Sequence, residues 1–138
     1  ACATLTRPNN ACWSYDNRAA GLRIPSSAAA ARRVENRLPG ADANPYLAIA
    51  ASLAAGLYGI EQQLQPTPPL QGELEVPEEL SLPCTLHAAL ERLKSSQLAK
   101  ELFGHEFIEG YIASKTLELT SFFDEITPWE RRVLAAQV

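Results

Sequence analysis

The stretch ACWSYDNRAAGLRIPSSAAAARRVENRLP, residues 11–39, alternates short runs of β-forming residues with pairs of turn residues. Asp16-Asn17 and Ser26-Ser27 are the turn pairs, and they predict strands on either side. The expected strands are residues 11–15, 21–25 and 33–38. With helical spacing after them, the pattern predicts an α+β fold: short antiparallel strands, the remnant of a larger sheet, followed by about four helices.

The third expected strand carries charged side chains on one face. A period of two puts Arg33, Glu35 and Arg37 on that face and Arg32 on the other. A carboxylate between two arginines is typical of a site that holds a metal and an anion together. The same pattern is also found on a solvated strand surface, so both interpretations stay open.

Positive charge is concentrated at the start of the chain. Residues 1–37 contain six arginines, no lysine and two acidic residues, whereas the rest of the chain contains six basic and fourteen acidic residues. The planar guanidinium matches phosphate and carboxylate oxygens, so this part is expected to bind an anionic ligand. Nucleic acid is not expected as a partner, because the net charge is −4 and this part lacks lysine.

Residues 41–63 have helical character. Asp42 or Asn44 can cap a helix, and Pro45 suits its first turn. The apolar residues that follow lie nearly all around the helix, which predicts a buried helix. A membrane span is not expected, because about fifteen alanine-rich residues are fewer than the roughly twenty that a bilayer needs.

The remaining sequence divides into a loop and a helical part. Residues 64–84 are rich in proline and predict an extended surface loop. Residues 85–138 return to helical spacing, with helices expected at 85–103, 106–126 and 128–135.

The three cysteines, Cys2, Cys12 and Cys84, show neither a CxxC pair nor histidines at zinc spacing. A reduced, cytoplasmic setting is therefore expected, with a Cys2–Cys12 disulfide as the alternative. The chain has no methionine and does not start like a secretion signal, which predicts that it was cut from a longer chain.

Three stretches resemble consecutive motifs of the glutamine synthetase family, in the family's order. They are NRAAGLRIP at residues 17–25, RRVENRLP at residues 32–39 and ADANPYL at residues 41–47. Residues 111–138 resemble the ending of the subgroup that joins glutamate to amines or polyamines. The resemblance implies that residues 1–138 are the C-terminal segment of a glutamine synthetase-type catalytic domain.

The resemblance also implies a reaction and a role for five residues. The family uses ATP to phosphorylate the side-chain carboxylate of glutamate, and ammonia or an amine then displaces the phosphate. Arg18 and Arg37 are expected to be catalytic, at the transferred phosphate. Arg23 and Arg33 are expected to bind ATP, and Glu35 to be one ligand of Mg²⁺ or Mn²⁺.

Departures from the family pattern limit what this chain does alone. The acidic flap residue of ammonia-using members falls near Thr6, where there is no carboxylate, and this favours an amine substrate. One carboxylate cannot hold two or three cations, so the isolated chain is expected to be inactive. Glutamate, an amine or ammonia, the remainder of the parent enzyme and a homo-oligomeric ring are the implied partners. The alternative is a non-catalytic anion-binding or assembly module.

Overall fold

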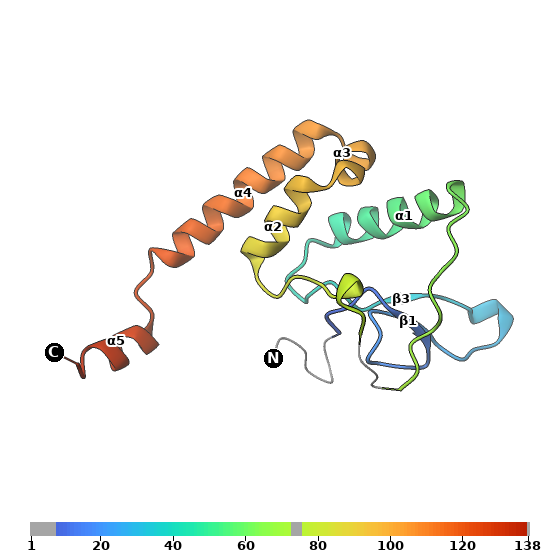
Figure 1. The fold of residues 1–138 in the computed structure, drawn as a ribbon, viewed down its shortest axis with the longest axis horizontal. Coiled ribbons are helices and arrows are strands. Elements are labelled where there is room, and N and C mark those ends of the chain that lie inside the picture. Colours follow the sequence, from blue (N-terminus) through green and yellow to red (C-terminus); the bar gives the residue numbers. More distant parts are fainter. Residues whose placement is uncertain (1–7, 73–75, 138) are drawn as a thin grey trace. The chain divides into compact units, whose positions relative to one another are not determined.

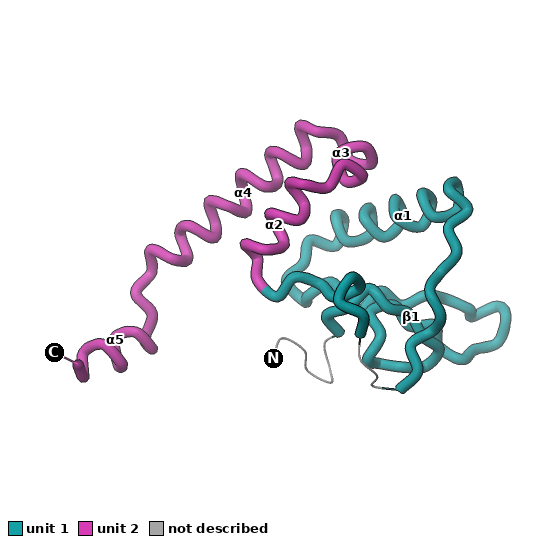
Figure 2. Tube along the Cα trace, in the orientation of Figure 1, with its two compact units in different colours: residues 1–84 teal, residues 85–138 magenta. Residues whose placement is uncertain are grey.

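The computed structural model describes residues 8–72 and 76–137 (Figure 1). The chain divides into two compact units, Ala1–Cys84 and Thr85–Val138 (Figure 2). The first unit contains the strands and one long helix, and the second is helical. The predicted α+β class is confirmed. Cys2 and Thr6, on which two expectations depended, lie outside the described residues.

The sheet of the first unit has three short strands in the order β1-β2-β3. They are β1 (Trp13–Tyr15), β2 (Leu22–Ile24) and β3 (Glu35–Asn36). The expected antiparallel pairing holds for β2 and β3, but it is wrong for β1 and β2, which are parallel. The reason lies in residues 16–21, which lead the chain back so that β2 starts at the same end of the sheet as β1.

Asn10 holds this returning segment in place. Its side chain is buried, donates from Nδ2 to the Ala19 carbonyl (3.0 Å), and accepts at Oδ1 from the amides of Cys12 (3.1 Å) and Gly21 (3.2 Å). A Cβ atom at Gly21 would lie 2.0 Å from the Asn10 carbonyl oxygen. The close approach of these two backbone segments therefore requires glycine at position 21.

The proline-rich segment is fastened to β1. The Leu70 amide donates to the Trp13 carbonyl (2.8 Å), the Ser14 hydroxyl donates to the Leu70 carbonyl (2.6 Å), and the Trp13 indole donates to the Thr67 carbonyl (2.6 Å). A 3₁₀ helix, η2 (Glu78–Leu80), follows. Residues 67–70 therefore lie along β1. A second 3₁₀ helix, η1 (Ala29–Ala31), lies between β2 and β3.

Helix α1 (Pro45–Glu61) forms where the sequence predicts it. Asn44 caps it, because its Oδ1 accepts from the amides of Tyr46 (3.0 Å) and Leu47 (3.3 Å). The expectation of a buried helix is wrong for the described part of the chain, since Tyr46 is 83% exposed and Ile60 75% exposed. Apolar residues make a helix suited to burial, but they do not say which residues cover it.

Cys12 is buried and carries a free thiol, so it takes no part in a disulfide. Burial raises the pKa of this thiol. The alternative that pairs Cys2 with Cys12 is therefore wrong.

The described residues of the second unit form four α-helices. They are α2 (Leu86–Ser95), α3 (Gln97–Phe103), α4 (His105–Phe123) and α5 (Pro128–Leu134). The single helix expected at 85–103 is two helices, because the Ser96 hydroxyl accepts from the Ala99 amide (3.1 Å) and starts a new helix. Gly104, with φ of +83°, separates α3 from α4.

The core of the second unit is small. Leu90 of α2 and Ile108 of α4 are its buried apolar residues among those described. A row of rings continues from it, with ring centroids 6.4 Å apart for Phe103 and Phe107 and 6.2 Å apart for Phe107 and Tyr111. Among the described residues, no helix has the length and apolar character needed to cross a membrane.

Candidate functional site

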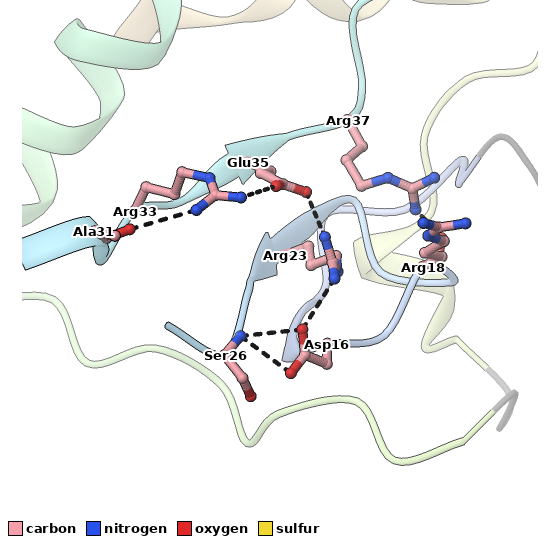
Figure 3. Close-up of polar contacts among 8 residues, drawn as sticks. All are labelled: Asp16, Arg18, Arg23, Ser26, Ala31, Arg33, Glu35 and Arg37. Atoms are coloured by element: carbon pink, nitrogen blue, oxygen red, sulfur yellow. Dashed lines mark hydrogen bonds and ion pairs between the residues drawn. The ribbon is translucent and has the colours of Figure 1, made fainter. Parts of the chain in front are cut away.

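Arg23 of β2 and Glu35 of β3 form an ion pair across the sheet. The two residues are directly opposite each other in the antiparallel register, and Arg23 Nη1 lies 2.8 Å from Glu35 Oε2 (Figure 3). Neighbouring residues on one face of such a pair are close enough for their side chains to interact. The side chains are 19% and 31% exposed, so this pair is partly withdrawn from water.

Arg33 binds the other oxygen of the same carboxylate. Arg33 Nη2 lies 3.1 Å from Glu35 Oε1, and Arg33 Nη1 donates to the Ala31 carbonyl (3.4 Å). The prediction that Arg33 and Glu35 share a face is therefore confirmed. Each oxygen of Glu35 has its own arginine.

Asp16 completes the charged network, which consists of Asp16, Arg23, Arg33 and Glu35. Its Oδ1 lies 2.9 Å from Arg23 Nη2, and both of its oxygens accept from the Ser26 amide, at 3.1 and 3.0 Å. The sequence predicted only a turn at this position. A usable signal was present, since Asp16 and Glu35 are the two acidic residues among the six arginines of residues 1–37.

The contacts of the charged network favour the ionised forms of Asp16, Arg23 and Glu35. Hydrogen bonding from Arg23, with smaller effects of Arg33, holds the pKa of Glu35 below its ordinary value. Hydrogen bonding from Ser26, followed by the charge of Arg23, lowers the pKa of Asp16. The hydrogen bond to Glu35 is the largest cause that raises the pKa of Arg23. Two carboxylates and two guanidiniums thus balance each other in charge.

Arg18 and Arg37 form a second pair of expected site residues. Arg37 Nη1 donates to the carbonyl of Arg18, and the Arg37 amide donates to the Gly21 carbonyl (2.9 Å). Within the described part of the chain, neither side chain forms an ion pair with a carboxylate. Among the described residues, the charges of Arg23 and Arg33 are thus balanced by carboxylates, whereas those of Arg18 and Arg37 are not.

Glu35 is the residue that the sequence predicts as a ligand of a divalent cation. The described residues contain no group of three or more histidine, cysteine or acidic side chains that could hold a metal ion. A hard cation takes six or more oxygen ligands, and both oxygens of Glu35 are bound to arginines. The described residues therefore supply no complete cation site, and the role of Glu35 as a ligand stays a prediction.

The family model for the glutamine synthetase catalytic domain matches residues 2–134. The chain belongs to the glutamine synthetase family. This confirms the resemblance seen in the three arginine-rich and helix-start motifs. It also shows that the charged network and the Arg18–Arg37 pair are parts of a glutamine synthetase-type catalytic domain.

Relatives within the glutamine synthetase family include enzymes named for amines. Glutamate–isopropylamine ligase from a Pseudomonas species is 44% identical over 124 residues, which are 88% of this chain and 27% of the relative. Gamma-glutamylethanolamide synthetase from Streptomyces coelicolor is 42% identical over 125 residues, 91% of this chain and 27% of the relative. Glutamine synthetase from Thermus thermophilus is 36% identical over 131 residues, which are 89% of this chain and 29% of the relative.

Solved structures show the same fold relationship. Ligand-free GmaS gives a TM-score of 0.75 at 33% identity and covers 91% of this chain and 30% of that one. A GmaS–ADP complex gives a TM-score of 0.75 at 34% identity, and the match covers 92% of this chain and 29% of the GmaS chain. This member of the glutamine synthetase family thus spans less than a third of the length of the proteins it matches.

Proposed function

We propose that this chain is the C-terminal segment of a cytoplasmic ATP-dependent ligase that joins the side-chain carboxylate of glutamate to an amine. Membership in the glutamine synthetase family supports the reaction class. The two relatives named for isopropylamine and ethanolamide support an amine in preference to ammonia. Ammonia remains the second candidate, supported by the similar glutamine synthetases.

The observation that carries the proposal is the position of Glu35 between Arg23 and Arg33. A face that only binds anions gains nothing from a half-buried carboxylate between two arginines, because the carboxylate cancels their charge. A site for a nucleotide and its cation needs both kinds of group. The contacts of 2.8 and 3.1 Å show that these three side chains lie together.

The proposed roles follow the charges of these side chains. Glu35 would supply one oxygen ligand to Mg²⁺ or Mn²⁺, and Arg23 and Arg33, no longer paired with it, would orient the nucleotide phosphates. Arg18 and Arg37 stabilise the negative charge on the transferred phosphoryl group, since no described carboxylate balances theirs. A bound cation would add positive charge at the same phosphates. A similar solved structure is a GmaS–ADP complex, which supports a nucleotide as a ligand of the parent enzyme.

The same proposal implies that the chain is incomplete as a catalyst. Its described residues supply one carboxylate to the cation site, so other parts of a parent enzyme would provide the remaining ligands. A ring of identical parent subunits is the proposed assembly. The non-catalytic alternative, an anion-binding or assembly module, predicts binding of anions without any need for Glu35.

A calorimetric titration with Mg-ATP tests the proposal. The purified chain is expected to bind weakly, and Glu35→Ala is expected to abolish the heat of binding. Glu35→Gln keeps the shape of the side chain and is expected to bind at least about tenfold more weakly, because a neutral amide is a poor cation ligand. Glu61→Ala, an exposed residue at the end of α1, serves as the matched control.

Two outcomes would contradict the proposal. If Glu35→Ala binds Mg-ATP as well as the unaltered chain, the anion-binding module is the better description. If no form binds, this chain does not carry a usable part of the nucleotide site.

A further inference from the structure

Asp16 stands at the end of β1 in an unusual backbone conformation. Its φ is +48°, in the left-handed region that side chains other than glycine, asparagine and aspartate rarely adopt. Its amide donates to the Ile24 carbonyl (3.1 Å). Aspartate is one of the few residues that tolerate this conformation, so Asp16 suits the short connection after β1.

The carboxylate of Asp16 gathers the end of β2 around it. It accepts from the Ser26 amide through both oxygens and from Arg23 Nη2 through Oδ1 (2.9 Å). Arg23, Ile24 and Ser26 are thus all bound to one residue of the neighbouring strand. Because the aliphatic part of the Arg23 side chain extends from β2, these contacts determine where its guanidinium lies.

Arg23 is held from two sides. Its Nη1 is bound to Glu35 Oε2 (2.8 Å) and its Nη2 to Asp16 Oδ1 (2.9 Å), while its buried Nε has no described partner. A guanidinium held at both terminal nitrogens cannot rotate about the Cζ–Nη bonds without breaking one contact. If Glu35 turned to another ligand, Asp16 would still hold Arg23.

We propose that Asp16 is a positioning residue, which fixes the Arg23 guanidinium in the orientation that meets the nucleotide phosphates. The ligand in this inference rests on the proposed function, whereas the fixing of Arg23 does not. A positioning role and a bystander role predict opposite changes in anion affinity when the charge of Asp16 is removed. Removing a negative charge beside an anion site strengthens anion binding if Asp16 only contributes charge, and weakens it if Asp16 holds Arg23 in place.

Nuclear magnetic resonance of the chain with ¹⁵N-labelled arginine gives the first test. Arg23 of the unaltered chain is expected to show separate, slowly exchanging signals for its Nη hydrogens. Averaged signals, as in free arginine, would overturn the proposal whether or not any variant folds.

The variant Asp16→Asn gives the second test. Asparagine tolerates a positive φ and keeps an acceptor for the Ser26 amide, but it loses the ion pair with Arg23. The Arg23 Nη signals are expected to average in this variant. The affinity for Mg-ATP is expected to fall about five- to tenfold. Asp42→Asn is the matched control, because it removes the same charge at an exposed residue of the same unit.

Each outcome decides between the two roles. An Arg23 guanidinium that stays immobile in Asp16→Asn, or an affinity of Asp16→Asn that is no lower than that of Asp42→Asn, would overturn the proposal. If the unaltered chain binds no Mg-ATP at all, the proposed function fails. The Nη signals of the two variants then still decide whether Asp16 positions Arg23.

Discussion

Arg23 and Glu35 occupy opposite positions in the antiparallel register of β2 and β3, and their side chains meet at 2.8 Å. Arg23, which is expected to bind the nucleotide, and Glu35, which is expected to bind the cation, are therefore neighbours in the sheet register and also form an ion pair. This pair depends on the sheet register, because a shift by one residue would send the two side chains to opposite faces. Anything that changes the register is expected to separate them.

Gly21→Ala is expected to disturb this register. A Cβ atom would lie 2.0 Å from the Asn10 carbonyl oxygen and 2.7 Å from Leu38 Cδ2, and the first contact is with backbone that cannot swing aside. The expected loss in the free energy of unfolding is about 1–3 kcal/mol, measured as a lower urea midpoint. Gly56→Ala in α1 meets nothing within 4 Å and is expected to be neutral or stabilising. Equal midpoints for the two variants would contradict this account.

The charged network is expected to stabilise the fold in a pH-dependent way. The pKa values of Glu35 and Asp16 are lowered in the folded state. Their contribution is therefore fully present above the ordinary carboxyl pKa, about 4, and is lost as the pH falls through the lowered values. Glu35→Gln is expected to be less stable than the unaltered chain at pH 7. The difference between their urea midpoints should shrink below about pH 4.

The control for this pH dependence is Glu61→Gln. Glu61 lies at the exposed end of α1 and is expected to give a pH-independent difference close to zero. A gap between Glu35→Gln and the unaltered chain that persists unchanged to pH 2 would show that the ion pairs do not stabilise the fold.

Thr127→Ala is expected to loosen α5. Thr127 and Glu130 form a capping box, in which the Thr127 hydroxyl accepts from the Glu130 amide (3.1 Å) and the Glu130 carboxylate accepts from the Thr127 amide (2.7 Å). Losing this cap costs about 1 kcal/mol, and the Glu130 amide should exchange with solvent about fivefold faster. Thr116→Ala, within α4, is the control, and protection of Glu130 that survives Thr127→Ala would rule out the cap.

The purified chain is expected to form no amide from glutamate, ATP and an amine. The physical reason is the single carboxylate that its described residues offer to a cation. Release of phosphate and formation of a γ-glutamyl amide are measured side by side over several hours. Detectable product that disappears in Glu35→Ala would refute this expectation, whereas product that persists in Glu35→Ala would indicate a contaminating enzyme.

The local features of the site were accessible from sequence because they depend on neighbouring residues. The two-residue spacing of Arg33 and Glu35 predicted that they share a face, although β3 begins only at Glu35, and Asn44 with Pro45 marks the start of α1. Asp16 was not predicted as a site residue. Its contact with Arg23 depends on the parallel pairing of β1 and β2, which a turn-residue pattern does not specify.

Two features of the helices were missed for different reasons. The break between α2 and α3 lies at Ser96, whose hydroxyl caps α3. The helical spacing of apolar residues continues on both sides of Ser96, so that spacing did not indicate the break. The exposure of α1 was missed because composition reports what a surface is suited to contact. Leu53 of α1, for example, is 62% exposed and is not buried by any described residue.

The returning segment between β1 and β2 has a consequence for sequence variation. Asn10 binds the backbone at Ala19 and Gly21, and Asp16 binds the amide of Ser26. These contacts fix the number of residues between their attachment points in residues 16–26. A single inserted or deleted residue would bring the wrong backbone groups to them, so natural variants of this chain are expected to differ here in side chains and never in length.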